Sequence, residues 1–300
     1  MTALNVSVPP GTRPRDRRVK TNVKRSLGYF ALIVFALIFI GPFILQVATS
    51  FKTDPDASNN PLSLIPHPAT ISAWRQVFGI GAAGASTDFP RWFFNSVLVS
   101  TCITIGRVFL DSLAGYSLAR LRFPGRRVVF GLVLGTLAVP GVVLLIPRFL
   151  MLKQLGLFNS YPGMILPIAV DATGIFLMRQ FFLQVPEALE EAGKVDGASI
   201  WQVYWRVVLP VVRPGLITLT ILSFQGSWNE FQFFQISTIS PKYYTLTTGL
   251  ANLVGGGLSA GNQYPLKLAA AALTIIPVAL MFFKLQKYLV RGGMSGSVKG

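Results

Sequence analysis

The stretch EALEEAGKVDGASIWQVYWRVVLPVVRP, residues 187–214, decides the architecture that we expect for the rest of the chain. It is the one long polar segment in an apolar second half. It holds four of the eleven acidic residues: Glu187, Glu190, Glu191 and Asp196. Pro186 suits the first turn of a helix, and the glutamates that follow lie near the positive end of its dipole. The segment therefore predicts a short helix at its start.

A second short helix is expected after a bend. Gly197 accepts the left-handed conformation that ends many helices, and Ser199 can cap the next one. In that second helix the spacing predicts an apolar stripe of four residues, Trp201, Tyr204, Trp205 and Val208. Pro210 and Pro214 limit it before the next apolar segment. Periodicity alone leaves two interpretations open: the bent pair docks on a partner, or it lies on the membrane surface with its stripe in lipid.

The composition indicates a membrane protein. Of 300 residues, 52% are hydrophobic and 13% are charged, whereas soluble chains carry about 25% charged residues. Six apolar segments approach the roughly 20 residues that span a bilayer: 26–51, 92–118, 128–147 with a kink at Pro140–Gly141, 161–182, 214–240 and 268–283 with a C-terminal extension. Residues 52–90 and 241–265 are expected to be loops.

Three charged residues lie inside these segments, where charge is costly and usually pairs or faces the protein interior. Arg107 and Asp111 are four apart and so share a helix face. They form either a mutually satisfied pair or a site in a pathway. Asp171 is either a pathway residue or close enough to the outer interface to be hydrated.

The net charge of +16 invites a nucleic-acid interpretation, but its distribution argues against one. Lys and Arg are concentrated in the N-terminal arm, after the second span, around residues 187–214 and at the C-terminus, and are sparse between them. By the positive-inside rule, both termini and the 187–214 segment are cytoplasmic. Single Cys102 and His67 residues disfavour a disulfide, a metal site and a catalytic triad. No phosphate-binding GxxxxGK[ST] loop is present, so energy for active transport must come from another chain or an ion gradient.

The pivotal segment resembles the EAA loop of permease subunits of ABC importers. The pattern falls on Glu191, Ala192 and Gly193, then on Gly197, and later on Val207, Leu209 and Pro210. Gly193 replaces the second alanine, which loosens the helix by up to about 1 kcal/mol. Val207 replaces isoleucine.

Further stretches resemble the shorter permease subunit of carbohydrate importers of the maltose type. They are NSVLVS (95–100), AGYSLARLRFPGR (114–126), LIPRFLMLKQLGLFNSYPGMIL (145–166), LMRQFF (177–182), SWNEF (227–231) and the C-terminal MSGSVKG. The resemblance implies an all-α membrane protein of six transmembrane helices with the MetI-like permease fold and cytoplasmic coupling helices between helices 4 and 5. Residues 1–26 would be a disordered basic cytoplasmic arm, 27–290 the permease domain with its coupling loop at 186–214, and 291–300 a cytoplasmic tail.

The resemblance also implies partners: a second homologous permease subunit, two ATPase subunits that use ATP and Mg²⁺, an extracytoplasmic solute-binding protein, a sugar substrate and membrane lipid. This chain itself would bind no cofactor and catalyse no reaction. The implied ATPase-coupling residues are Glu191, Ala192, Gly193, Asp196, Gly197, Ala198, Leu209 and Pro210. Lys299 in the tail would also approach the ATPase.

Substrate contacts are expected at Trp228, Asn229 and Glu230, because an indole face suits sugar C–H surfaces and the other two can hydrogen-bond hydroxyls. The alternative is helix packing and gate structure. For the whole chain, three alternatives to sugar import stay open: a permease of this superfamily for a non-sugar solute, an ion-coupled carrier, and a membrane-embedded enzyme.

Overall fold

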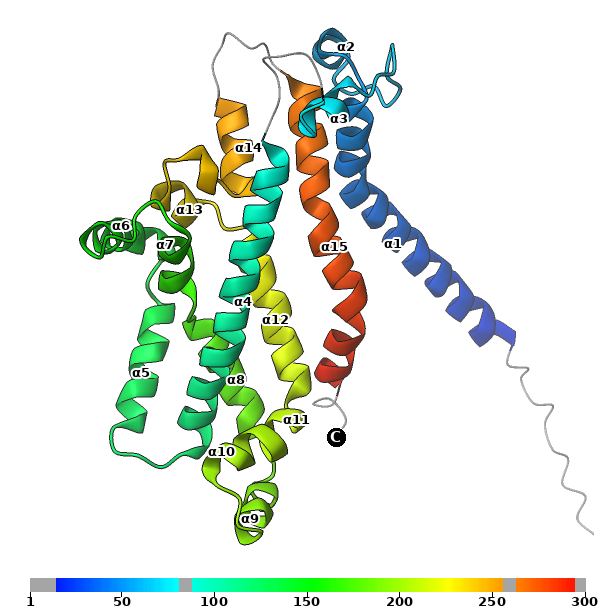
Figure 1. Ribbon diagram of the computed structural model, residues 1–300. Helices are drawn as coiled ribbons and strands as arrows, with labels where there is room; N and C mark the ends of the chain where they lie inside the picture. Colours follow the sequence, from blue (N-terminus) through cyan, green and yellow to red (C-terminus); the bar gives the residue numbers. More distant parts are fainter. Residues whose placement is uncertain (1–14, 81–87, 256–262, 295–300) are drawn as a thin grey trace, which may run out of the picture.

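Three long helices run lengthwise through the computed structural model, which describes residues 15–80, 88–255 and 263–294 (Figure 1). They are α1 (Arg15–Ser50), α4 (Phe89–Arg120) and α15 (Tyr264–Met294). Each contains a segment long and apolar enough to cross a membrane. The helices predicted over 26–51, 92–118 and 268–283 are therefore confirmed. Helix α1 begins earlier than expected, so the predicted arm is helical from Arg15, and residues 1–14 lie outside the described part.

The third expected span is not one helix. Helix α5 (Arg126–Leu137) is followed by a 100° bend, after which η1 (Gly141–Leu144) and α6 (Leu145–Gln154) run in another direction. The segment predicted as one kinked span over 128–147 is therefore two helices in different directions, and the break lies at the predicted Pro140–Gly141 position. Pro140 has no N–H to continue the helix. Twelve residues of α5 reach only about 18 Å, short of the roughly 30 Å of a bilayer core.

The fourth and fifth expected spans are also interrupted. Helices α7 (Tyr161–Ile165) and η2 (Leu166–Ile168) meet α8 (Ala172–Leu183) at 44°. Helix α12 (Arg213–Trp228) ends before the predicted boundary at residue 240, and α13 (Gln232–Ser237) starts after a break. The Glu230 carboxylate accepts the Phe233 N–H at 2.9 Å and so initiates α13 separately. By length and composition the described chain supports three continuous spans, or up to six if each bent pair is one span.

Short helices cover the end of the molecule where α4 begins (Figure 1). They are α2 (Asp54–Asn59), α3 (Ser72–Val77), η4 (Pro241–Tyr243) and α14 (Leu246–Gly255). The segment 241–265 is therefore not simply a loop. Residues 81–87 and 256–262, which include most of the predicted Gly/Ala tract, lie outside the described part of the chain.

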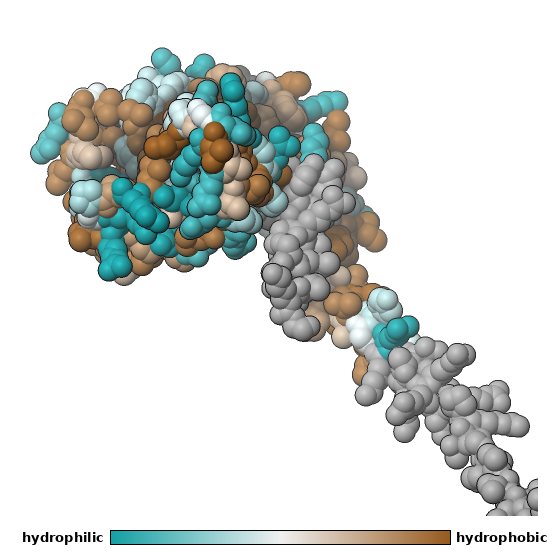
Figure 2. Space-filling model, turned by 90° about the horizontal axis from the view of Figure 1, so that it is seen from below, coloured by the Kyte–Doolittle hydropathy of each residue, from teal (hydrophilic) through white to brown (hydrophobic). Residues whose placement is uncertain are grey.

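The coupling segment occupies the opposite end. Helix α9 (Glu187–Val195) lies there, together with α10 (Ile200–Gln202), and the described ends of α1 and α15 point the same way (Figure 1). Between the two ends, α4 packs against both α8 and α12. Figure 2 views the molecule from the α9 end and shows α1 extending away from the body. The apolar side chains of α1 are exposed over most of its described length, as expected of a surface that lipid or another membrane subunit covers.

Candidate functional site: the bent helices at residues 187–214

The bend in this segment forms as the sequence predicts. Helix α9 ends at Val195, and Gly197 takes a φ of +79°, a conformation that other residues adopt only with strain. Ser199 then caps α10 in a reciprocal capping box: its hydroxyl accepts the Gln202 N–H, and its own N–H is bound by the Gln202 side chain at 2.8 Å. Local chemistry therefore fixes where the first short helix ends and where the second begins.

The predicted apolar stripe on the second helix is only half correct. After α10 the chain continues as a π-helix, η3 (Val203–Val208), and then as α11 (Leu209–Val211). Tyr204 and Val208 are buried, whereas Trp201 and Trp205 are 54% and 41% exposed. A π-helix has more residues per turn than the period of 3.6 on which the stripe was predicted. Two of the four aromatic and aliphatic residues therefore face outward.

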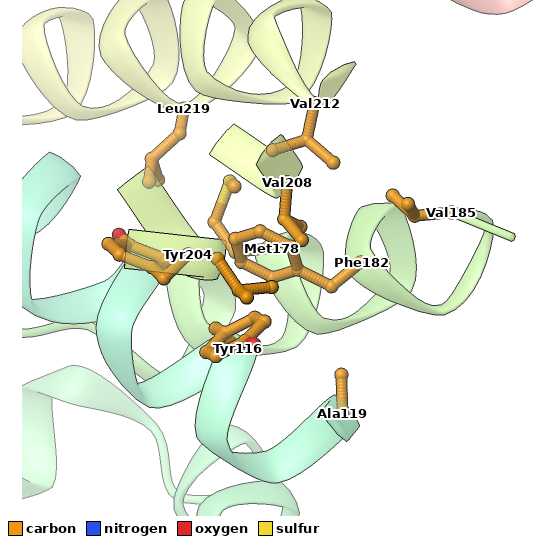
Figure 3. Packing of buried hydrophobic residues seen from close by; sticks show 10 residues of the cluster. Tyr116, Ala119, Met178, Phe182, Val185, Tyr204, Val208, Val212 and Leu219 are labelled. Carbon is orange, nitrogen blue, oxygen red and sulfur yellow. The ribbon is translucent and has the colours of Figure 1, made fainter. Parts of the chain in front are cut away.

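The buried half of this stripe joins a hydrophobic cluster that ties the segment to the membrane helices (Figure 3). Tyr116 comes from α4, Phe182 and Met178 from α8, and Tyr204 from η3, with the rings of Tyr116 and Tyr204 5.1 Å apart. The Tyr204 hydroxyl lies 2.7 Å from the Ser112 hydroxyl of α4, so its polar end is satisfied. A displacement of η3 would therefore act directly on α4 and α8.

Helix α9 is held by a buried ion pair that the sequence analysis did not identify. Arg120 Nε in the last turn of α4 lies 3.0 Å from Glu190 Oε1, and the two side chains are 7% and 8% exposed. The N–H does not point at this oxygen, so the contact is electrostatic and not an aligned hydrogen bond. The Tyr116 hydroxyl donates to the other Glu190 oxygen at 3.4 Å.

Arg120 also binds the end of α8. Its guanidinium donates to the carbonyls of Phe182, at 2.7 Å from Nη2, and of Val185, and it lies 3.4 Å from the exposed carboxylate of Glu187. One side chain thus joins α4, α8 and α9. No sequence feature distinguished Glu190 from its neighbours, but its spacing of three from Gly193 places both residues on one face of α9.

The opposite face of α9 is exposed in the described chain. Glu191 and Val195 are four residues apart, and both are exposed, Val195 to 87%. Ala192, Asp196 and Gly197 are also exposed. Val195 is one of several exposed apolar side chains of this segment, with Leu189, Ile200 and Trp201, and such a group fits a docking surface. We call Glu191, Ala192, Val195 and Asp196 the outer face of α9.

The remaining predicted coupling residues connect α9 to the core. A Cβ at Gly193 would meet Val203 and Val207 side-chain carbons at 3.4 and 3.5 Å, so α9 packs closely on η3 there. Ala198 and Leu209 are half-buried against the cluster of Figure 3, and Pro210 is exposed. Lys299 lies outside the described residues.

The charged residues inside the spans do not pair as one alternative expected. Arg107 and Asp111 are not in ion contact. Arg107 Nε donates to the Ile168 carbonyl at 2.8 Å, and Asp111 accepts the Asp171 N–H at 3.0 Å. Asp171 in turn caps α8, since its carboxylate accepts the Gly174 N–H at 3.3 Å. The mutual pair is therefore wrong, and each group instead fixes the backbone where η2 meets α8.

The three predicted substrate residues lie in different environments. Trp228 is buried in a second cluster with Trp92 and Leu266, and its indole N–H donates to the Thr274 carbonyl at 3.1 Å. Trp228 is therefore packed in this structure, as the packing alternative expects, and contact of its ring with a sugar stays a prediction. Asn229 is exposed, and Glu230 lines a polar cavity.

Comparison with known proteins finds extensive similarity. Residues 111–292 match the family described as binding-protein-dependent transport system inner membrane component. The chain is 33% identical over 271 residues to the arabinooligosaccharides transport system permease protein AraQ of Halalkalibacterium halodurans, which covers 90% of this chain and 94% of that protein. It is 29% identical over 272 residues to the sn-glycerol-3-phosphate permease protein UgpE of Yersinia enterocolitica, with 90% and 96% covered.

Two further matches extend the comparison. The polygalacturonan/rhamnogalacturonan permease protein YtcP of Bacillus subtilis is 30% identical over 298 residues and is covered completely, with 94% of this chain aligned. A chain in the crystal structure of a bacterial ABC transporter that imports the polysaccharide alginate superposes with a TM-score of 0.76, covering 93% of this chain and 99% of that chain. At 24% identity this last likeness establishes the fold alone.

Proposed function

This chain belongs to the family of binding-protein-dependent transport system inner membrane components, and from this premise we propose that it is the permease subunit through which a sugar or oligosaccharide is imported. It is a multi-pass membrane protein. Family membership argues against the ion-coupled carrier and the membrane-embedded enzyme that the sequence left open.

The choice of a sugar is supported by the relatives. The arabinooligosaccharide and polygalacturonan permeases align with 90% or more of this chain and with nearly their whole length. The glycerol-phosphate permease aligns equally well, so a small phosphorylated polyol is the main alternative within the family.

The observation that carries the mechanism is the division of α9 into two faces. Glu190 on the inner face is locked to Arg120 of α4, and the outer face with Glu191 and Val195 is exposed at one end of the molecule. We place an ATPase subunit against that outer face. If α9 moves with the ATPase, α4 and α8 would be displaced with it, because the buried ion pair and the tightly packed cluster of Figure 3 connect the three helices.

We expect the rest of the assembly to be arranged around this placement of the ATPase. The α9 end and both termini would be cytoplasmic, as the basic loops require. Two ATPase subunits would use ATP and Mg²⁺, a homologous permease subunit would complete the pathway, and a solute-binding protein would deliver the sugar outside. One related structure, at TM-score 0.62, is of an alginate ABC transporter in complex with a periplasmic protein that holds an alginate pentasaccharide.

The test is transport by the complete assembly in proteoliposomes. We expect the binding protein loaded with sugar to stimulate ATP hydrolysis and uptake, and Glu191→Ala to reduce both sharply while membrane insertion stays unchanged. Glu187→Ala is the matched control, because it removes an exposed glutamate one turn before Glu191 whose carboxylate lies 3.4 Å from Arg120 and which is not among the four residues of the outer face. Equal activity of Glu191→Ala and the native protein would exclude this coupling role, and uptake without ATP would exclude the proposed function.

A further inference from the structure

A cavity of about 180 Å³ lies between α4, α6, η2, the start of α8 and the end of α12. It is lined by Arg107, Arg148, Ile168, Val170, Asp171, Gly226, Ser227 and Glu230. Four of these eight residues are charged. No residue of the coupling segment lines it, so the cavity has no direct part in ATPase docking. Its lining suggests a binding site instead.

The cavity lies about midway along the membrane-spanning helix α4. Arg107 is 18 residues from the start of the 32-residue helix α4, which places it roughly 27 Å along a helix about 48 Å long. Charged side chains at such depth face the protein interior or a water-filled path and are usually paired. Within the described residues, however, no ion pair within 4.0 Å joins Arg107 or Arg148 to Asp171 or Glu230.

The two carboxylates are already occupied by backbone groups. Asp171 accepts the Gly174 N–H at the start of α8, where the helix dipole also favours negative charge. Glu230 Oε1 accepts the Phe233 N–H at 2.9 Å. Both acids therefore serve as structural caps, and each keeps roughly three of its four acceptor positions, about six in all.

Most N–H donors of the two guanidinium groups have no described hydrogen-bond acceptor. Each arginine carries five N–H donors. Arg107 uses Nε for the Ile168 carbonyl, and its Nη atoms have no described hydrogen-bond partner. Arg148 contacts the Phe233 ring at 5.6 Å, and no described residue accepts a hydrogen bond from it. The two guanidinium groups thus bring about nine N–H donors without a described partner, more than the roughly six acceptor positions that the two carboxylates retain.

We propose that this cavity is a substrate-contact site for an anionic sugar, with Arg107 and Arg148 binding the carboxylate or phosphate that the sugar carries. Guanidinium groups bind both anions bidentately, with more geometric specificity than lysine provides. The cavity is smaller than the 300–1,000 Å³ typical of ligand pockets, so it holds one charged unit of a solute and not a whole oligosaccharide. The proposal rests on the proposed function and narrows its substrate class.

A cysteine probe tests the sign of the potential in the cavity without a known substrate. Gly226 is exposed, and a Cβ there would meet only Arg107 Nη1, at an ordinary 3.9 Å. Gly226→Cys in a Cys102→Ser background, within the complete assembly, would be treated with anionic sulfonatoethyl methanethiosulfonate and with its cationic trimethylammonioethyl analogue. Each rate is normalised to that of free mercaptoethanol.

We expect the anionic reagent to be favoured, and Arg107→Gln or Arg148→Gln to reduce that preference by about tenfold. Arg91→Gln, on the same helix as Arg107 but paired with Asp88 outside the cavity, should leave it unchanged. A preference for the cationic reagent, no preference, or a thiol that is unreactive in the assembly would each overturn the proposal.

Protection from labelling tests the ligand class. Digalacturonate or glucose phosphate should slow the modification of Gly226→Cys, and their relative potency separates carboxylate from phosphate. Neutral galactobiose should not slow it. Protection by galactobiose alone would overturn the anionic class while leaving sugar import intact, whereas an assembly that hydrolyses ATP without responding to any loaded binding protein would remove the proposed function instead.

Discussion

Glu190 and Arg120 form a buried ion pair, and the variants Glu190→Gln and Arg120→Gln should destabilise the protein to different extents. They differ because Arg120 has further partners and Glu190 has few. Glutamine preserves the shape of Glu190 and removes its charge. Arg120 then still binds the Phe182 and Val185 carbonyls and lies 3.4 Å from Glu187. We therefore expect a loss of about 1.5–3 kcal/mol, the range for a hydrogen bond to a charged group, because the Tyr116 hydroxyl then meets a neutral amide in place of a carboxylate.

Arg120→Gln removes more. It leaves the Glu190 carboxylate, 8% exposed, with only the Tyr116 hydroxyl at 3.4 Å, and it deprives two carbonyls at the end of α8 of their donor. Breaking a buried pair in this way costs about 3–5 kcal/mol. The exposed Glu191→Gln is the matched control and should change stability by no more than about 0.5 kcal/mol.

The assay is unfolding by sodium dodecyl sulfate in mixed micelles, followed by circular dichroism, on the two single variants, the double variant and the control. The double variant should lose less than the sum of the singles, since the second substitution removes a charge that the first had left unpaired. Strictly additive losses, or losses no larger than that of Glu191→Gln, would refute the argument that this pair holds α9 on α4.

Two glycines on the coupling segment give opposite expectations. Gly193→Ala should raise the free energy of unfolding by up to about 1 kcal/mol, because alanine favours the helix and its Cβ meets Val203 and Val207 only at ordinary contact distance. A lower free energy of unfolding in the same detergent titration would mean that α9 packs on η3 more tightly than in the structure. Gly197→Ala should cost about 1–2 kcal/mol, because φ is +79° there, and a change of less than 0.5 kcal/mol would indicate that the bend forms without the left-handed conformation.

The sequence predicted the coupling segment more accurately than the membrane helices. Its bend and cap depend on local chemistry, in which Gly197 and the Ser199–Gln202 box act within a few residues. The stripe was half wrong because the π-helical turn of η3 changes the periodicity, and the turn is stabilised by tertiary packing of Tyr204 that a single sequence does not reveal.

Long-range contacts account for the other differences. Arg120 and Glu190 are 70 positions apart in the sequence. The structural role of Glu190, which Glu191 does not share, therefore emerges only when α4 and α9 are brought together. The spacing of Arg107 and Asp111 allows an ion pair on one helix face. In the structure, however, each side chain forms a hydrogen bond with the backbone near η2 and α8. The packing of Trp228 against Phe224 and the helix α15 likewise depends on residues distant in the sequence, which the SWNEF pattern does not reveal.

The most direct test of the central claim, that the outer face of α9 receives an ATPase subunit, is association of that subunit with Val195→Asp. Val195 is 87% exposed and makes little contact within the chain, so the substitution should leave folding and membrane insertion intact. We predict that the native protein co-purifies with the ATPase and that Val195→Asp loses most of it, while Glu187→Ala retains it. Full retention of the ATPase by Val195→Asp, with hydrolysis still stimulated by the loaded binding protein, would contradict the account.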